Sequence, residues 1–562
     1  MAAKPLVLKK QKAKRSSRAK TFSASAEVYV TELPFHLNEN FTYGIPDELL
    51  PKVKIGTKVK VPFKDIEKIG YIRRIDQKEA HARPIFDIKE NIGIPESHIN
   101  FLLATAERYG TNLDSILKFV KTGPLSQVEP SSKRFRPRFQ FSKDLVFEDL
   151  VEEIEVSSGR TLVIAPTDRE LAHIKREIGL HLDSEEKCIF GLRSAIMQHF
   201  ADLENIFIFD EFSEHYRERK SPYWHTRDVA ILRSRFEPIK LKFISALPSM
   251  ELFQYSRRRI IDIPKPDFRS HKNQIAYLPN SYYETVKAGL RQGSVLVSVA
   301  TKDLVLAIIC RKCRGALKCE CGGKFQFDSS NKLTCVICST LNSQWRCPIC
   351  SSHEVVELRS GASRLKDQFR KIFPRTPIYL STAEKPIEKV PKGSIVIATP
   401  GMEPQEKYSA IVFLDSEFRV NAPYLRAEEQ TRIQIYSLLR FLEKDGSFYV
   451  DLAPNHPLIQ SLLKRSPLID MERELKEREH LGLPPIWNLT KISNGSTFQI
   501  AESIQQLLSG ARIQFVNSNK SLLVRTKELD TAILMKELIL AQKFLSLKQL
   551  NLLKIEREPL DI

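Results

Sequence analysis

The residues with the clearest chemistry in this chain of 562 residues are its cysteines. Eight of the nine lie between Cys310 and Cys350, in the order C-x2-C, C-x-C, C-x2-C and C-x2-C, and the ninth, Cys188, stands alone. Thiolates bind Zn2+ tetrahedrally in groups of four, so this window predicts two four-cysteine zinc sites. Four thiolates leave no open position for water, so we expect the zinc to hold structure and not to catalyse hydrolysis.

A disulfide framework is the alternative use of so many cysteines. The chain lacks the pattern of a signal peptide at its start, and Cys188 has no neighbouring cysteine in the sequence. Both features favour a reducing, cytoplasmic location, where thiols stay free to bind metal.

The chain is basic, with 87 Lys and Arg against 68 Asp and Glu and a formal net charge of +19. Nucleic acid attracts such an excess, because cations that contact phosphates release bound counterions. No apolar run approaches the roughly 18 to 20 residues that cross a bilayer, and no basic amphipathic helix indicates a membrane surface. Composition therefore favours a nucleic-acid partner and no membrane, and a basic surface that serves only solubility is the alternative.

Short apolar segments alternate with helical patterns through most of the chain, which is typical of an α/β multidomain protein with parallel sheets. The first residues are rich in Lys and Arg without an acid, a composition typical of a disordered tail. In chain order, the predicted domains are a basic disordered tail at 1–25, a β-rich domain at 26–96, a helical segment with a linker at 97–140, two α/β lobes at 141–275 and 276–465, a zinc insertion in the second lobe at 308–353, and a C-terminal domain at 466–562.

The linker ends in a basic and aromatic segment, residues 131–139, with the sequence SSKRFRPRF. This composition suits contact with phosphates and stacked bases. A solvated linker is the simpler interpretation of the same residues.

A pair of acids follows a strand in the first lobe. The apolar run Ile206–Phe209 leads directly into Asp210 and Glu211, and open α/β sheets bind ligands at the carboxyl ends of their strands. In a nucleotide hydrolase these two carboxylates would hold Mg2+ and position a water molecule. A strand ending in two acids is common, so the pair alone does not establish a nucleotide site.

Short motifs along most of the chain occur in a distinctive order: Phe41–Pro46, Gly56–Phe63, Ile69–Ile72, Leu162–Pro166, Arg193–Ala195, Asp210–Glu211, Tyr223–Arg233, Ser245–Glu251, the cysteine window, Arg426–Glu429, Asn455–Pro457, Glu474–Arg478 and Leu483–Pro485. In this order they resemble the motifs of the PriA family of replication restart proteins.

The resemblance implies a β-rich N-terminal domain that binds 3′ DNA ends, two RecA-like helicase lobes with a two-zinc insertion in the second, and a small α+β C-terminal domain. It pairs the zinc ligands as Cys310, Cys313, Cys347 and Cys350 for zinc 1, and Cys319, Cys321, Cys335 and Cys338 for zinc 2. The residues that match the family's 3′-end pocket are Phe41, Thr42, Tyr43 and Lys64.

The nucleotide motifs of the family are degenerate in this chain. A helicase of this class needs G-x4-G-K-[S/T] to cradle phosphates, and no such motif is present. The acidic box survives only as Asp210 and Glu211 followed by Phe212, and the arginine motif leaves at best Arg440 to reach a phosphate. We therefore predict that the lobes persist as a scaffold, that the site is vestigial, and that the protein is not an enzyme.

The expected function is replication restart without helicase activity. We expect binding to forked or single-stranded DNA, contact with other primosome proteins and with single-stranded DNA-binding protein, reloading of the replicative helicase, and zinc as the only cofactor, without ATP. Two alternatives stay open. One is an ATP-dependent 3′ to 5′ helicase with an atypical nucleotide site, and the other is a zinc-ribbon protein that binds nucleic acid such as RNA.

Overall fold

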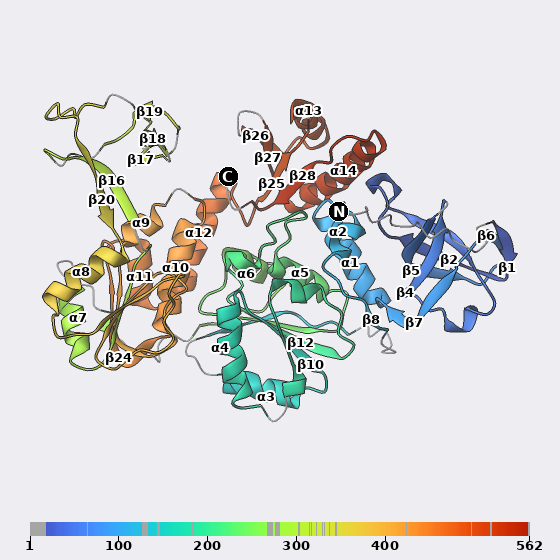
Figure 1. Cartoon of the computed structure of the whole chain (residues 1–562), viewed down its shortest axis with the longest axis horizontal. Helices are drawn as coiled ribbons and strands as arrows, with labels where there is room; N and C mark the ends of the chain where they lie inside the picture. Colours follow the sequence, from blue (N-terminus) through green and yellow to red (C-terminus); the bar gives the residue numbers. More distant parts are fainter. Residues whose placement is uncertain are drawn as a thin grey trace, which may run out of the picture. The chain divides into compact units, whose positions relative to one another are not determined.

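In a computed structural model, the chain forms two compact units (Figure 1). The first contains residues 1–141, 146–264 and 473–562, and the second contains residues 142–145 and 265–472. The structure describes residues 18–64, 66–125, 133–142, 147–182, 185–266, 274–275, 282–301, 304–313, 315, 317–321, 323–328, 330, 332–336, 338–342, 345–422, 424–495, 497–516 and 520–559.

The first unit begins with an eight-stranded sheet in the order β1-β6-β3-β2-β5-β4-β7-β8. Its strands are β1 (Lys20–Phe22), β2 (Ala24–Val30), β3 (Asn40–Ile45), β4 (Thr57–Phe63), β5 (Ile66–Asp76), β6 (Ala80–Pro84), β7 (Asp87–Gly93) and β8 (Gly123–Pro124). In β4, buried Val59 and Val61 alternate with partly exposed Lys58 and Lys60, as expected for a strand with one buried face.

This sheet extends past both predicted boundaries of the β-rich domain. β1 pairs with β6, with Lys20 opposite Ala82, so the sheet begins inside the predicted tail at 1–25. β8 pairs with β7, with Gly123 opposite Gly93, so the sheet also takes a strand from beyond residue 96. β1 and β8 each pair with a strand that is distant in the sequence. A local pattern of charge or hydrophobicity does not predict such long-range pairing.

Two helices lead from this sheet to the first lobe, α1 (Glu96–Arg108) and α2 (Leu113–Leu117). The lobe is a parallel sheet in the order β11-β10-β12-β13-β9. Its strands are β9 (Arg138–Phe141), β10 (Arg160–Ile164), β11 (Cys188–Gly191), β12 (Leu203–Phe209) and β13 (Lys240–Ser245), and its helices are α3 (Glu148–Val156), α4 (Asp168–Gly179), α5 (Thr226–Arg233) and α6 (Met250–Arg257).

Successive residues of β12 point to opposite faces of this sheet. Ile206 and Ile208 pack with residues of α1 and α5, whereas Phe207 and Phe209 pack with residues of α3 and α4. The sheet is therefore apolar on both faces, which is the reason its strands are continuous hydrophobic runs in the sequence.

The first unit ends with a four-stranded antiparallel sheet in the order β26-β27-β25-β28. Its elements are β25 (Asn488–Ser493), α13 (Thr497–Leu507), β26 (Arg512–Val516), β27 (Ser521–Thr526), α14 (Glu528–Leu547) and β28 (Lys554–Arg557). One face of α14 places Leu534, Met535 and Leu538 in the core of this sheet.

The second unit is a six-stranded parallel sheet in the order β14-β24-β23-β15-β22-β21. Its elements are β14 (Gln274–Ile275), α7 (Tyr282–Leu290), β15 (Val295–Ser298), α8 (Ala362–Ile372), β21 (Ile378–Ser381), β22 (Ile395–Ala398), β23 (Tyr408–Phe413), α9 (Ser416–Val420), α10 (Ala427–Leu439), β24 (Leu442–Val450), α11 (Pro457–Lys464) and the start of α12 (Pro467–Leu481). The cysteine region is inserted between β15 and α8, and comprises β16 (Leu304–Cys310), β17 (Phe325–Phe327), β18 (Leu333–Cys335), β19 (Leu341–Asn342) and β20 (Val355–Ser360).

In the part of the chain that the structure describes, no helix combines the length and apolar character needed to cross a membrane.

The two faces of α14 offer a matched test of the core of the C-terminal sheet. Leu534 is fully buried, whereas Leu529 on the same helix is 83% exposed. Leu534→Ala removes buried methyl groups and leaves a cavity, so it should destabilise the domain by about 2–5 kcal/mol. Leu529→Ala should change stability by less than about 0.5 kcal/mol. Hydrogen–deuterium exchange of α14 measures both, and equal protection in the two variants would contradict this packing.

Candidate metal centre and DNA-binding domain

The eight clustered cysteines lie in two groups of four. In the first group, the sulfurs of Cys310 and Cys350 are 3.5 Å apart and those of Cys313 and Cys347 are 3.4 Å apart. Four thiolates around one ion at a Zn–S distance of about 2.3 Å would place their sulfurs roughly 3.8 Å apart. The spacing of these four thiolates therefore fits a tetrahedral metal ion.

The second group has the same geometry despite its shorter first knuckle. The sulfur of Cys319 is 3.6 Å from that of Cys338, and the sulfur of Cys321 is 3.5 Å from that of Cys335. The amide of Cys319 donates to the carbonyl of Gly323, which closes the turn around the C-x-C pair. The structure thus brings together the two sets of ligands that the resemblance implied.

The metal groups lie within a module that has little apolar core of its own. Ile308, Leu317, Phe325 and Leu333 form a small cluster with Cys335, and strands β16 and β20 pair antiparallel to connect the module to the lobe. A core of this size stabilises few residues, so bound metal would supply much of the folding free energy, as in other small metal-binding modules.

The four predicted 3′-end residues differ in their surroundings. Tyr43 is only 4% exposed, and its hydroxyl donates to the carbonyl oxygen of Pro62 at 3.1 Å. Burial raises the pKa of Tyr43 to about 12. Its ring belongs to the core of the N-terminal sheet, so Tyr43 acts here as a core aromatic residue.

The other three residues lie nearer the surface. Thr42 and Lys64 are exposed, and Lys64 has a positive φ of 52° in the turn after β4. The ring of Phe41 meets that of Phe63 edge to face, with 5.3 Å between their centres. This contact brings the motif on β3 next to the turn that carries Lys64.

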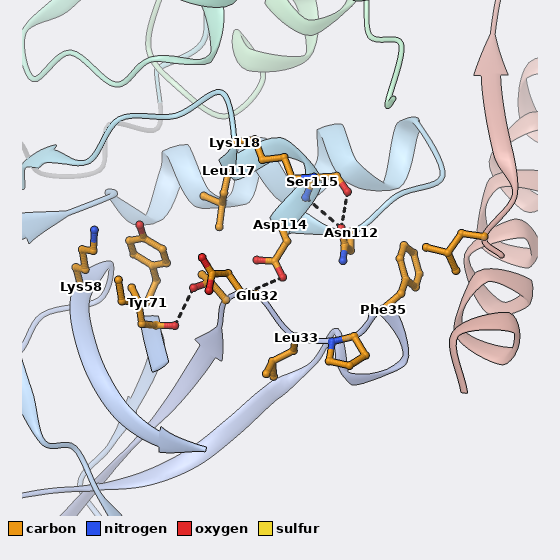
Figure 2. Close-up of a pocket in the computed structure, with 14 residues that line it drawn as sticks. Glu32, Leu33, Phe35, Lys58, Tyr71, Asn112, Asp114, Ser115, Leu117 and Lys118 are labelled. Carbon is orange, nitrogen blue, oxygen red and sulfur yellow. Dashed lines mark hydrogen bonds between the residues drawn. The ribbon is translucent and has the colours of Figure 1, made fainter. Parts of the chain in front are cut away.

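A separate hollow of about 720 Å3 lies between the N-terminal sheet and α2 (Figure 2). Figure 2 shows Lys58 and Tyr71 on one side of it and Asp114 and Lys118 on the other. Asp114 accepts a hydrogen bond from the amide of Glu32 at 3.0 Å. Cations and carboxylates line this hollow together, so its charge does not favour an anionic ligand.

The predicted nucleotide pair is split between two environments. Asp210 directly follows β12 in a left-handed conformation, with φ of 45°. Glu211 is fully buried, and its carboxylate accepts a hydrogen bond from the amide of Ser249 at 2.7 Å. The guanidinium of Arg227 lies 3.7 Å from the same carboxylate. Glu211 therefore faces the interior of the lobe.

Burial raises the pKa of Glu211 from its usual 4.5 to about 7, although Arg227 and the amide of Ser249 act in the opposite direction. Arg227 also contacts the carboxylates of Glu251 at 3.1 Å and Asp228 at 3.3 Å. Asp228 has a strongly lowered pKa, because the neighbouring guanidinium groups of Arg227 and Arg108 outweigh its burial.

The chain segment between β9 and α3 has none of the glycines of a phosphate loop in its sequence. It consists of residues 142–147, with the sequence SKDLVF and no glycine. A loop that cradles phosphates with its amides needs glycines at defined positions. Residues 143–146 of this segment lie outside the described residues.

Arg440, the remaining residue of the arginine motif, follows α10 in the second unit. Its Nε donates to the carbonyl of Ser437 at 3.2 Å, and its guanidinium lies 5.8 Å from the ring centre of Phe441. These local contacts hold Arg440 against its own helix end.

Sequence reasoning missed the role of Arg227 and of its surroundings. Arg217 donates to the carbonyl oxygens of Arg557 and Glu558, and Arg557 donates to that of Arg108. The motif Tyr223–Arg233 contains Arg227, but charged residues in a helix normally face water, so nothing in the motif signalled burial.

Comparison with known proteins agrees with the N-terminal geometry. Residues 29–121 match the family model described as the PriA 3′ DNA-binding domain, 3′BD. A "Probable replication restart protein PriA" from Mycobacterium tuberculosis is 24% identical over 362 residues, which cover 59% of this chain and 55% of the relative. The chain is PriA-like.

A further relative of the PriA-like chain is the "Replication restart protein PriA" of Haemophilus influenzae, 22% identical over 412 residues that cover 61% of this chain and 55% of the relative. The PriA-like chain thus spans about half the length of the curated relatives it matches.

Two helicases are among the solved structures similar to the PriA-like chain. The NS3-like helicase from Alongshan virus has 11% identity and a TM-score of 0.29, and covers 58% of this chain and 74% of its own. The Escherichia coli DEAH/RHA helicase HrpB has 11% identity and a TM-score of 0.28, and covers 61% of this chain and 48% of its own. Likeness at this level carries no argument about function.

The metal sites predict a defined stoichiometry. Purified protein should contain two zinc ions per chain, and Cys310→Ser should reduce the content to one by opening the first four-thiolate group. Cys188→Ser, outside both groups, should leave it at two. Elemental analysis after dialysis measures the content, and a chelator should unfold the module by removing both ions. Retention of two ions by Cys310→Ser would contradict the grouping.

Glu211 predicts a pH dependence of stability. Between about pH 4.5 and pH 7 the buried acid keeps its proton while the unfolded chain releases one, so stability falls as pH rises through this window. Glu211→Gln should flatten the change in melting temperature between pH 5 and pH 7. Glu214→Gln, at an exposed position in the same loop, should keep the wild-type profile. An unchanged profile in Glu211→Gln would refute the raised pKa.

Proposed function

We propose that this PriA-like chain binds DNA at abandoned or branched replication forks and promotes assembly of the primosome, without unwinding DNA itself. Its 3′ DNA-binding domain supports recognition of a nascent strand end. The names of its relatives, replication restart proteins, support the same process.

The main support for the proposal that the lobes do not hydrolyse ATP is the sequence of the segment between β9 and α3. Residues 142–147 contain no glycine, whereas the phosphate cradle that nucleotide hydrolysis of this class requires has glycines at defined positions. Glu211, which would help to activate water, is instead fully buried beside Arg227. Both observations favour a scaffold over a motor.

A scaffold at the fork acts by holding other proteins in place. We infer that its partners are other primosome proteins and single-stranded DNA-binding protein, and that the two metal groups keep a rigid module on the second unit available for such contacts. Reloading of the replicative helicase is the outcome expected of this assembly. An ATP-driven helicase with an atypical site is the alternative that the experiment must exclude.

The test compares DNA binding with ATP turnover in zinc-loaded protein. Fluorescence anisotropy should detect binding to a labelled fork with a 3′ end at its branch point, tighter than to a blunt duplex of equal length. A phosphate-release assay should detect no ATP turnover above the protein-free background, with or without the fork. Fork-stimulated turnover would refute the scaffold proposal.

The matched variant is Asp210→Asn, since Asn tolerates the left-handed backbone at this position better than most residues. It should bind the fork as the wild type does, because Asp210 lies outside residues 29–121, which match the 3′ DNA-binding domain. If the wild type hydrolyses ATP and Asp210→Asn does not, the chain is a motor and the pair at the end of β12 is its site.

A further inference from the structure

The basic segment before β9 is part of the first lobe and is not a solvated linker. Nε of Arg134 donates to the carbonyl of Arg235 at 2.8 Å, and its Nη2 donates to that of Phe236 at 3.1 Å. The amide of Asp262 donates to the carbonyl of Pro137 at 2.9 Å. Arg134 thus fastens the segment to the turn after α5, where a cation also meets the negative end of the helix.

Two ammonium groups lie close to the ring of Phe135, which belongs to this segment. Nζ of Lys133 lies 5.1 Å from the centre of its ring, and Nζ of Lys240 lies 5.7 Å from the same centre. Cations are attracted to the face of an aromatic ring within this distance. The two charges are therefore held near each other on exposed residues.

This segment and the neighbouring chain positions 235 and 240 carry a group of six cations, here named the basic edge. It comprises Lys133, Arg134, Arg136, Arg138, Arg235 and Lys240, all of which are exposed. Two of these cations form ion pairs with described carboxylates. Glu204 lies 2.7 Å from Lys240, and Asp262 lies 3.1 Å from Arg136. The described residues of the basic edge therefore carry more positive than negative charge.

The basic edge lies at the amino end of the parallel sheet. β9 begins at Arg138 and the adjacent strand β13 begins at Lys240. Asp210 and Glu211 follow the carboxyl end of β12, so they lie at the opposite end of the strands from the basic edge. The basic edge is therefore separate from the vestigial nucleotide site, and it is also separate from the 3′ DNA-binding domain at residues 29–121.

We propose that the basic edge binds backbone phosphates of DNA, as a second contact surface beside the 3′ DNA-binding domain. Ammonium and guanidinium groups are the usual partners of phosphate oxygens, and such contacts position a protein without reading sequence. A protein partner would need an apolar centre in the interface, whereas the ring of Phe135 lies beneath two ammonium groups. This inference rests on the proposed function, because it assigns part of the same fork-binding activity.

The test is the salt dependence of fork binding by a triple variant, Lys133→Gln, Arg138→Gln and Arg235→Gln. It retains Arg134, which holds the segment, and it retains Arg136 and Lys240, which pair with Asp262 and Glu204. Removing one cation that binds a phosphate should reduce the slope of log affinity against log salt by about one. We expect the slope to fall by about two to three and the affinity at 0.15 M salt to fall at least about tenfold.

The matched control removes three other exposed lysines, Lys371, Lys389 and Lys392 of the second unit, by substitution with Gln. It should keep a slope close to that of the wild type. An equal decrease of slope in both triple variants would show a general charge effect and would overturn the assignment to the basic edge. Both variants must keep the wild-type melting temperature and zinc content.

The outcomes separate this inference from the proposed function. Wild-type protein that fails to bind the fork would refute the proposed function. Wild-type protein that binds the fork, together with a basic-edge variant of unchanged slope and affinity, would refute only the assignment of the basic edge.

Discussion

The guanidinium of Arg227 lies among four carboxylates in the first unit, those of Glu211, Asp228, Glu251 and Glu558. Each isolated buried charge would cost several kcal/mol, so the groups are tolerable only together. Two features reduce the net negative charge of this cluster. Arg108 lies 3.9 Å from Asp228, and burial raises the pKa of Glu211 to about 7, so that this acid is partly protonated near neutrality.

This cluster ties together segments that are far apart in the chain. Glu211 follows β12, Glu251 lies at the start of α6, and Glu558 follows β28 near the end of the described residues. Removing Arg227 would leave several carboxylates without their shared partner. The ionic cluster around Arg227 therefore connects the first lobe to the C-terminal sheet. Glu211, an acid that would serve catalysis in a hydrolase, is paired with Arg227 in this cluster.

Much of the architecture followed from local pattern. Apolar runs such as Ile206–Phe209 predicted strands buried on both faces, and the motif order predicted a PriA-like chain. The errors came from contacts between distant residues. β1 is held by β6, so part of the predicted tail is a strand. The motif that contains Tyr43 left open whether its ring was in the core or at the surface, and the structure places it in the core with its hydroxyl bonded to Pro62. A motif gives the type of a residue and not the direction of its side chain.

The sequence by itself determined the spacing of the cysteine pairs, the apolar strands of the two lobes, and the absence of a glycine-rich phosphate motif, because each depends on residues within a few positions of one another. Only the tertiary structure decided which charged residues are buried around Arg227 and which gather at the basic edge. Lys133 and Lys240 meet at Phe135 although more than a hundred positions separate them. A sequence does not show whether a charged side chain is buried or exposed. Packing of the sheets decides whether that side chain contacts a carboxylate in the core or water at the surface.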